Sequence, residues 1–120
     1  MHFSISTTII SVFLGTAYAA EHNVDVGEDG FVFNPKTVTA AVGDTVVFHF
    51  FPGPHAVAQS TFDAPCTGVD GGFYSGFINT ASGESPTTFT ITVNDTNPIW
   101  YYCDATLHCQ NGMVGAINPP

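Results

Sequence analysis

The stretch that decides the fold runs from Ile99 to Ile117 and reads IWYYCDATLHCQNGMVGAI. Two apolar runs, residues 99–103 and 113–117, enclose a loop that contains Asp, Asn and Gly. Such a pattern predicts two short β-strands joined by a loop. Cys103, His108 and Met113 follow one another in this segment at intervals of five residues. The connection between the two strands therefore carries a thiol, an imidazole and a thioether.

Short β-branched and aromatic runs recur along the rest of the chain, separated by Gly, Pro, Asn and Asp. No long stretch has helical periodicity, and at most one helical turn, near residues 61–64, is expected. Gly43-Asp44 predicts a hairpin turn between strands over residues 37–42 and 45–51. The other predicted strands cover residues 22–26, 31–33, 55–59 and 87–93. Seven or eight short strands at this spacing predict an all-β fold, a two-sheet β-sandwich.

Residues 60–83 break the strand pattern with a segment that contains Gly, Ser and Pro. We expect the aromatic side chains of this segment to be buried; they are Phe62, Phe73, Tyr74 and Phe77. An irregular segment of this length is uncommon in a compact domain and usually needs a constraint. Cys66 lies within it, so a disulfide bond is the expected constraint.

The N-terminal residues have the character of a secretory signal. Residues 3–14 are apolar apart from small hydroxyl side chains, and Ala17-Tyr18-Ala19 has the small-x-small pattern of a cleavage site. The apolar stretch is shorter than the roughly 20 residues that a membrane-spanning helix needs. We therefore predict a signal peptide over residues 1–19, one domain over residues 20–120, and a secreted, extracellular protein without a membrane span.

The composition is strongly acidic. Lys36 is the only basic side chain against ten acidic ones, which gives a net charge of −9. This charge repels nucleic acid and anionic membranes, and it would steer a partner with a positively charged surface. A requirement for solubility explains the same charge equally well.

The three cysteines are an odd number, so pairing two of them leaves one thiol. A Cys66–Cys109 disulfide would leave Cys103 beside His108 and Met113. A Cys66–Cys103 disulfide would instead leave Cys109 free and remove the thiol from the evenly spaced run. We favour the first pairing, because the remaining thiol then has a function as a metal ligand. The second pairing stays open.

His55, upstream, completes a set of donors that suits copper. A thiolate and two imidazoles form a trigonal set, and a weak axial thioether is the usual fourth ligand of a type 1 site. Taken singly, Met113 could be a core residue and His55 a loop or core residue. Zinc is the rival metal, but a Cys-His-His-Met set would be unusual for it. We predict one copper ion bound by His55, Cys103, His108 and Met113.

These residues resemble the ligands of cupredoxins, the blue copper proteins. The Cys directly after the second His is similar to phytocyanins, where it bridges to a mid-chain Cys, here Cys66. The resemblance covers residues 24–119 and is strongest to secreted fungal members of the family; it rests on residues 43–50, 60–66, 98–103 and 108–114. It implies a Greek-key sandwich with type 1 copper at one end.

This resemblance implies a one-electron carrier that works with a redox partner protein, and we expect a monomer. Four protein donors leave no open position for a substrate, so we do not expect an enzyme. The flanks of Cys103, Tyr102 and Asp104, also lack the His residues that lead to the trinuclear cluster of multicopper oxidases. A module for copper storage or delivery remains the alternative, because it would use the same ligands.

The sequence departs from the family in two places. Ala56 stands after the first His, where cupredoxins usually carry an Asn, Ser or Thr that ties the two ligand loops together. Relatives often continue into a Ser-rich tail and a lipid-anchor signal, whereas this sequence ends at Pro120. We expect either free secretion or a truncated piece of a longer chain.

Two further sites follow from local motifs. Asn94-Asp95-Thr96 is a glycosylation sequon in a predicted turn, so Asn94 is a candidate acceptor. Cleavage after Ala19 would place His22 third in the mature chain. An amine, two amides and an imidazole would then offer a square-planar set for a second copper ion. An ordinary role for His22 in the first strand is the favoured reading.

Overall fold

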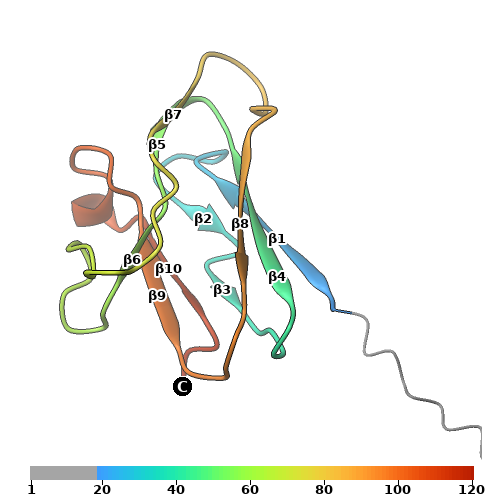
Figure 1. The fold of residues 1–120 in the computed structure, drawn as a ribbon. Helices are drawn as coiled ribbons and strands as arrows, with labels where there is room; N and C mark the ends of the chain where they lie inside the picture. Colours follow the sequence, from blue (N-terminus) through green and yellow to red (C-terminus); the bar gives the residue numbers. More distant parts are fainter. Residues whose placement is uncertain (1–18) are drawn as a thin grey trace, which may run out of the picture.

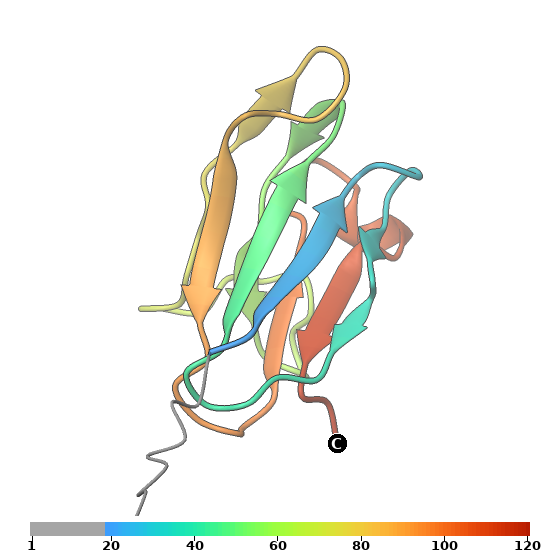
Figure 2. The ribbon, with the colours of Figure 1, turned by 90° about the vertical axis from the view of Figure 1, so that its right-hand side faces the viewer.

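Two four-stranded β-sheets face each other in the computed structural model, which describes residues 19–120 (Figures 1 and 2). The first sheet has the order β2 (Phe33–Asn34), β1 (Glu21–Val26), β4 (Thr45–Phe50) and β8 (Thr88–Thr92). The second has the order β3 (Thr37–Val38), β10 (Val114–Ile117), β9 (Ile99–Tyr102) and β6 (Ala58–Ser60). A small sheet of β5 (Gly53–His55) and β7 (Ile78–Thr80) lies at one end. The predicted all-β, two-sheet sandwich is confirmed.

The predicted hairpin at Gly43-Asp44 is wrong. Strand β3 before this turn pairs with β10, whereas β4 after it pairs with β1 and β8 in the other sheet. The turn itself is well formed, because the Asp44 carboxylate accepts hydrogen bonds from the amides of Ala41 and Ala20 at 2.9 Å each. The turn therefore carries the chain across the sandwich, as the connections of a Greek key do.

The described residues form ten strands rather than seven or eight, for two reasons. The strand predicted over residues 55–59 is divided at Ala56-Val57 into β5 and β6, which belong to different sheets. The segment predicted to be irregular contains β7, which pairs with β5. Residues 61–64 form no helix, and the helical turn that exists is a 3-10 helix, η1 (Cys109–Asn111), in the loop between β9 and β10.

The core lies between the two main sheets and is rich in valine and aromatic side chains. Strand β1 alternates, so that Val24 and Val26 are fully buried. Tyr101 of β9 meets the rings of Phe33 and Phe48 edge-on, with centroid distances of 4.9 and 5.1 Å. Gly115 opposite it leaves this space, since a Cβ there would lie 2.4 Å from the Tyr101 ring.

The segment over residues 60–83 does not bury its aromatic side chains as expected. Phe62, Tyr74 and Phe77 are 71%, 48% and 54% exposed, and only Phe73 packs against the core. The segment instead crosses the outer face of the second sheet, where Ala58 and Tyr102 of the sheet form a small cluster with the sulfur-bearing side chains of Cys66 and Cys109. A local cluster of this kind needs fewer apolar groups than a core.

The predicted signal peptide over residues 1–19 lies, apart from its last residue, outside the described residues. Within residues 19–120, no helix has the length and the apolar character that a membrane crossing requires.

Candidate metal centre

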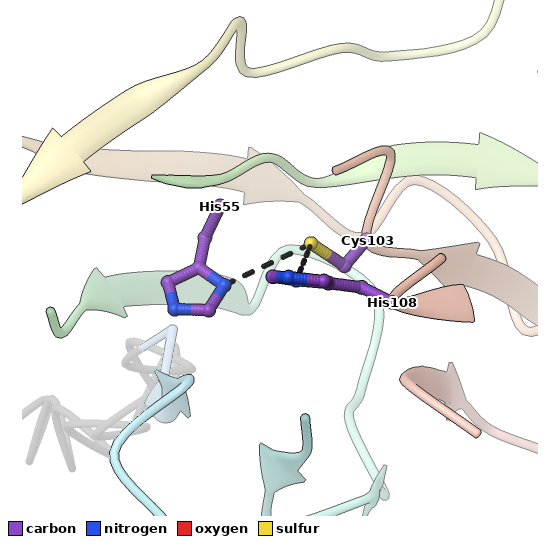
Figure 3. A group of neighbouring side chains, drawn as sticks. All are labelled: His55, Cys103 and His108. Atoms are coloured by element: carbon purple, nitrogen blue, oxygen red, sulfur yellow. Dashed lines mark hydrogen bonds between the residues drawn. The ribbon is translucent and has the colours of Figure 1, made fainter. Parts of the chain in front are cut away.

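His55, Cys103 and His108 come together at the end of the sandwich that carries β5 and β7. His55 is the last residue of β5, Cys103 directly follows β9, and His108 directly precedes the 3-10 helix. One donor atom from each lies within 4.8 Å of the others (Figure 3). Cys103 Sγ is 3.4 Å from Nδ1 of His108 and 3.9 Å from Nδ1 of His55. All three residues are buried, so the cluster is shielded from water.

The ring of His55 is held by a hydrogen bond at Nε2, the ring nitrogen that does not face Cys103. Nε2 lies 3.0 Å from the carbonyl oxygen of Pro52, and because a carbonyl can only accept, Nε2 carries the proton. This tautomer leaves a lone pair on Nδ1, which is the nitrogen that faces Cys103. Gly27 makes room for the ring: its φ is +77°, and a Cβ there would lie 2.1 Å from Nε2 of His55.

The ring of His108 is held by an aromatic neighbour. Phe31 stacks on it with a centroid distance of 4.0 Å and an interplanar angle of 27°. Phe31 itself is 46% exposed, so one of its faces covers the imidazole while part of the ring meets solvent. Burial lowers the pKa of His108, and it also lowers the pKa of His55. Both imidazoles are therefore neutral donors near pH 7.

The surroundings of Cys103 shift the pKa of its thiol in two opposite directions. Burial raises its pKa, whereas hydrogen bonds from the backbone amides of Ala56 and Ala105 lower it. Those amides would stabilise the thiolate once a cation is bound beside it. The side chain of Ala56 has no polar group to tie the ligand loops together, but its backbone amide joins the β5 side of the site to Cys103.

Residues 103–113, between β9 and β10, form the ligand loop, and Met113 lies at its C-terminal end. Its carbonyl accepts from the amide of Cys103 and its amide donates to the carbonyl of His108, both at 3.1 Å. The side chain is fully buried in the same cluster as Cys103. The role of Met113 as an axial ligand stays a prediction.

The disulfide bond in the structure joins Cys66 and Cys109, so the alternative pairing of Cys66 with Cys103 is excluded. Cys103 is left as a free, buried thiol. Because Cys109 directly follows His108, the bond attaches the segment over residues 60–83 to the ligand loop.

The chemistry of the three donors fits copper. One soft thiolate and two imidazoles are the trigonal set of a type 1 copper site, and they are brought together from the end of β5 and from the loop between β9 and β10. Three features that hold these donors were not recognised from the sequence: the room left by Gly27, the carbonyl of Pro52 and the stacking of Phe31. Gly27 lies in a turn that the sequence does show, but nothing local indicates that the turn packs against His55.

The two other predicted sites lie elsewhere. Asn94 is exposed just after β8, and its glycosylation stays a prediction. Nε2 of His22 lies 2.9 Å from Oδ2 of Asp44, and the amide of Ala20 donates to Oδ1 of the same carboxylate. These contacts hold His22 within strand β1, where it pairs with Val46 of β4, and they support the reading of His22 as a strand residue.

Comparison with known proteins gives a consistent result. Residues 20–118 match the family described as copper binding proteins, plastocyanin/azurin family. Two relatives come from Arthroderma benhamiae. An extracellular serine-rich protein is 40% identical over 107 residues, which is 88% of this chain and 42% of that one. A probable GPI-anchored cupredoxin is 36% identical over 121 residues, 100% of this chain and 61% of that one. The chain thus spans about half the length of these two relatives.

Solved structures show the same fold at lower identity. A purple cupredoxin from Nitrosopumilus maritimus superposes with a TM-score of 0.62 at 17% identity, covering 80% of this chain and 96% of that one. Spinach plantacyanin superposes with a TM-score of 0.56 at 24% identity, covering 84% of this chain and 100% of that one.

Proposed function

The chain belongs to the plastocyanin/azurin family of copper-binding proteins, and from this membership we propose that it is a one-electron carrier rather than an enzyme. His55, Cys103 and His108 would hold the ion, with Met113 as a further, weaker ligand. When bound there, copper supplies a couple between its cupric and cuprous states. The residues around it hold the donors in place and exclude water.

One observation carries this proposal: the three donors are already oriented toward one another by contacts within the protein. The Pro52 carbonyl fixes the His55 ring, Phe31 covers the His108 ring, and backbone amides reach the Cys103 sulfur. A site whose donors are fixed by the fold changes little between oxidation states. Small reorganisation is what favours fast electron transfer over tight storage.

Electrons would enter or leave at the exposed surface next to His108. Phe31 and Leu107 are 46% and 62% exposed there, and Pro52, Pro54 and Gly112, which lie close in sequence to the ligands, are exposed as well. Such an apolar surface allows close approach of a partner protein, while the net charge of −9 favours a partner with a positively charged surface. We propose that the protein meets this partner as a monomer.

We also propose that the protein acts outside the cell. The apolar N-terminal segment, the disulfide bond and the name of one relative, an extracellular serine-rich protein, all support this location. Asn94, exposed after β8, would then be available for glycosylation.

Copper loading of the wild type and of Cys103→Ser tests the metal site. The wild type should show an intense visible thiolate-to-copper band and the narrow hyperfine splitting of type 1 copper in its electron paramagnetic resonance spectrum. The variant should lose both. A wild type that binds copper fully and stays colourless would contradict the assignment.

Stopped-flow kinetics then separates a carrier from a store. A carrier should be reduced and reoxidised in fast, repeatable cycles while copper stays bound. Slow cycles with copper released on reduction would instead support storage or delivery.

A further inference from the structure

A second feature lies on the outer face of the second sheet, away from the copper donors. A pocket of about 290 Å³ is present there, and none of the four predicted copper ligands lines it. Its floor is one cross-strand row, because the strand register aligns Thr37, Ala116, Trp100 and Ser60 across β3, β10, β9 and β6. Because Ala116 and Ser60 on both sides of Trp100 are small, the indole projects from the face of the sheet.

The wall of the pocket comes from the segment that the disulfide holds. Phe62 contacts Trp100 with a ring centroid distance of 5.1 Å, and Pro65 lies beside it. Cys66 follows directly and is bonded to Cys109, so this wall is attached to the loop between β9 and β10. Phe62 is 71% exposed, a large apolar surface for a side chain that contributes nothing to the core.

The rim of the pocket holds the only basic side chain of the protein, that of Lys36. Within residues 19–120, no carboxylate lies within ion-pair distance of its ammonium group, although the chain has ten acidic residues. One unpaired cation beside an apolar pocket is complementary to an anion that carries an apolar group. The other lining residues are uncharged.

We propose that this outer-sheet pocket binds a small aromatic carboxylate. A single ring packs against Phe62 and Trp100 above Ala116, and the carboxylate lies at the ammonium group of Lys36. The size fits, because a cavity of about 150 Å³ holds benzene and the remaining space takes a short side chain. Apolar and aromatic walls with one orienting polar group are the usual composition of such sites.

Trp100 is the only tryptophan of the chain, so its fluorescence reports on this pocket alone. Reduced, copper-loaded protein is titrated with 3-phenylpropanoate while tryptophan emission and ligand-observed NMR are followed. We expect a saturable change with a Kd on the order of 1 mM or tighter for a ligand of this size. The copper spectrum of the reoxidised protein should be unaffected, which separates this site from the metal centre.

Four comparisons define the site. Phe62→Ala should weaken binding by about tenfold, as loss of an aromatic contact of roughly 1.4 kcal/mol would. Phe77→Ala, which removes a similarly exposed ring that does not line the pocket, should leave binding unchanged. Lys36→Met, and the neutral ligand 3-phenylpropanamide, should each weaken binding about two- to fivefold, as expected for one exposed ion pair.

The proposal is overturned if no saturable change occurs in either measurement. Equal binding of acid and amide, with no effect of Lys36→Met, would refute the carboxylate contact. Emission that depends on protein concentration without ligand, together with dimers in sedimentation, would show that a second copy of the chain occupies the pocket instead.

Discussion

Single residues far apart in the sequence determine how the copper donors are oriented. Gly27 and Phe31 lie in and after the turn that follows β1, yet they contact His55 and His108 respectively. The grouping of Cys103 and His108 with His55 could be predicted, because cysteine and histidine at this spacing are rare and chemically specific. Their supporting residues could not, because glycine and phenylalanine have many roles and only the folded chain shows which neighbour each one meets.

Gly27→Ala should disturb the copper site more than the fold. A Cβ at this position would overlap the His55 ring and would also force alanine into a positive-φ conformation. We expect a weaker or shifted thiolate-to-copper band. Gly30→Ala is the matched control, since Gly30 has a φ of +97° but no atom within 4 Å of the point where a Cβ would lie.

Both substitutions should lower the free energy of unfolding by about 1–2 kcal/mol through the backbone alone. Only Gly27→Ala should alter the visible spectrum. An unchanged spectrum in Gly27→Ala would show that His55 does not depend on this space.

Phe31→Leu should lower the reduction potential. Without the stacked ring, water reaches the His108 imidazole, and a more polar environment favours the more highly charged cupric state. A stacking contribution of about 1 kcal/mol corresponds to on the order of tens of millivolts for a one-electron couple. Voltammetry measures the shift, with Val32→Ala, an exposed apolar neighbour, as the control. Equal potentials in Phe31→Leu and wild type would argue against the role of the stack.

Among the structural elements, the ligand loop between β9 and β10 is constrained in three ways. It contains the 3-10 helix, its ends are joined by the backbone bonds of Met113, and Cys109 fixes it to Cys66. The two flanking strands were predictable from their composition. The crossing at Gly43-Asp44 was not, because a turn sequence specifies a local reversal of the chain but not the sheet that the next strand joins.

Replacing both disulfide cysteines, Cys66→Ala with Cys109→Ala, should destabilise the protein strongly. The bond closes a loop with a sequence separation of 43 residues, for which chain entropy gives about 4 kcal/mol. Urea unfolding of the copper-free protein measures the loss. Cys103→Ala is the control: it keeps the disulfide, so it should lose copper binding yet retain most of the stability. Equal stability of the double variant and wild type would contradict the constraint.

For the molecule as a whole, the strand pattern was enough to predict a two-sheet sandwich. Which strands pair with each other could not be predicted from the sequence. Parallel pairs such as β1 with β4 join segments that are separated by two other strands. Local sequence contains no information on such a pairing beyond the apolar face that both strands bury. The overall charge, in contrast, follows from composition alone and has consequences for the entire surface.

Electron exchange with small complexes should depend on their charge. With a net charge of −9, a cationic oxidant such as a cobalt(III) complex should react faster than an anionic one of equal driving force. Raising the ionic strength should slow the cationic reaction and accelerate the anionic one, since salt screens both interactions. Stopped-flow measurement at several salt concentrations checks this. Rates that do not respond to salt would show that the charge lies far from the site of transfer.

The copper-free protein should become less stable as the pH falls below about 6.5. Burial lowers the pKa of His55 and His108 in the folded state, so between that lowered value and 6.5 the unfolded chain binds more protons. The stability associated with the neutral rings is complete above pH 6.5 and is lost below it. Urea unfolding at pH 7.5 and 5.5 measures the difference, and His108→Gln should reduce it.

Asp44 makes the stability of the protein depend on pH in a second, more acidic range. Its hydrogen bonds with His22 and with the amides of Ala41 and Ala20 lower the pKa of the carboxyl from 3.8 to about 2. The folded state therefore gains stability from this carboxylate above pH 3.8 and loses it as the pH falls toward 2. In Asp44→Asn, the free energy of unfolding should depend less on pH between 2 and 3.8, while its decrease near pH 6 should remain. Urea unfolding at a series of pH values measures both.

The free thiol of Cys103 would give a bound metal ion a second effect, on which disulfide forms. Three reduced cysteines allow three pairings, and two of these would consume Cys103. An ion already held by this sulfur would act as a protecting group, because a coordinated thiolate does not attack another sulfur readily. Oxidation is then directed to the one remaining pair, Cys66 and Cys109. A chain that binds copper before it meets an oxidant would thus avoid the two wrong disulfide pairings. The ion would then favour the correct disulfide in addition to carrying electrons.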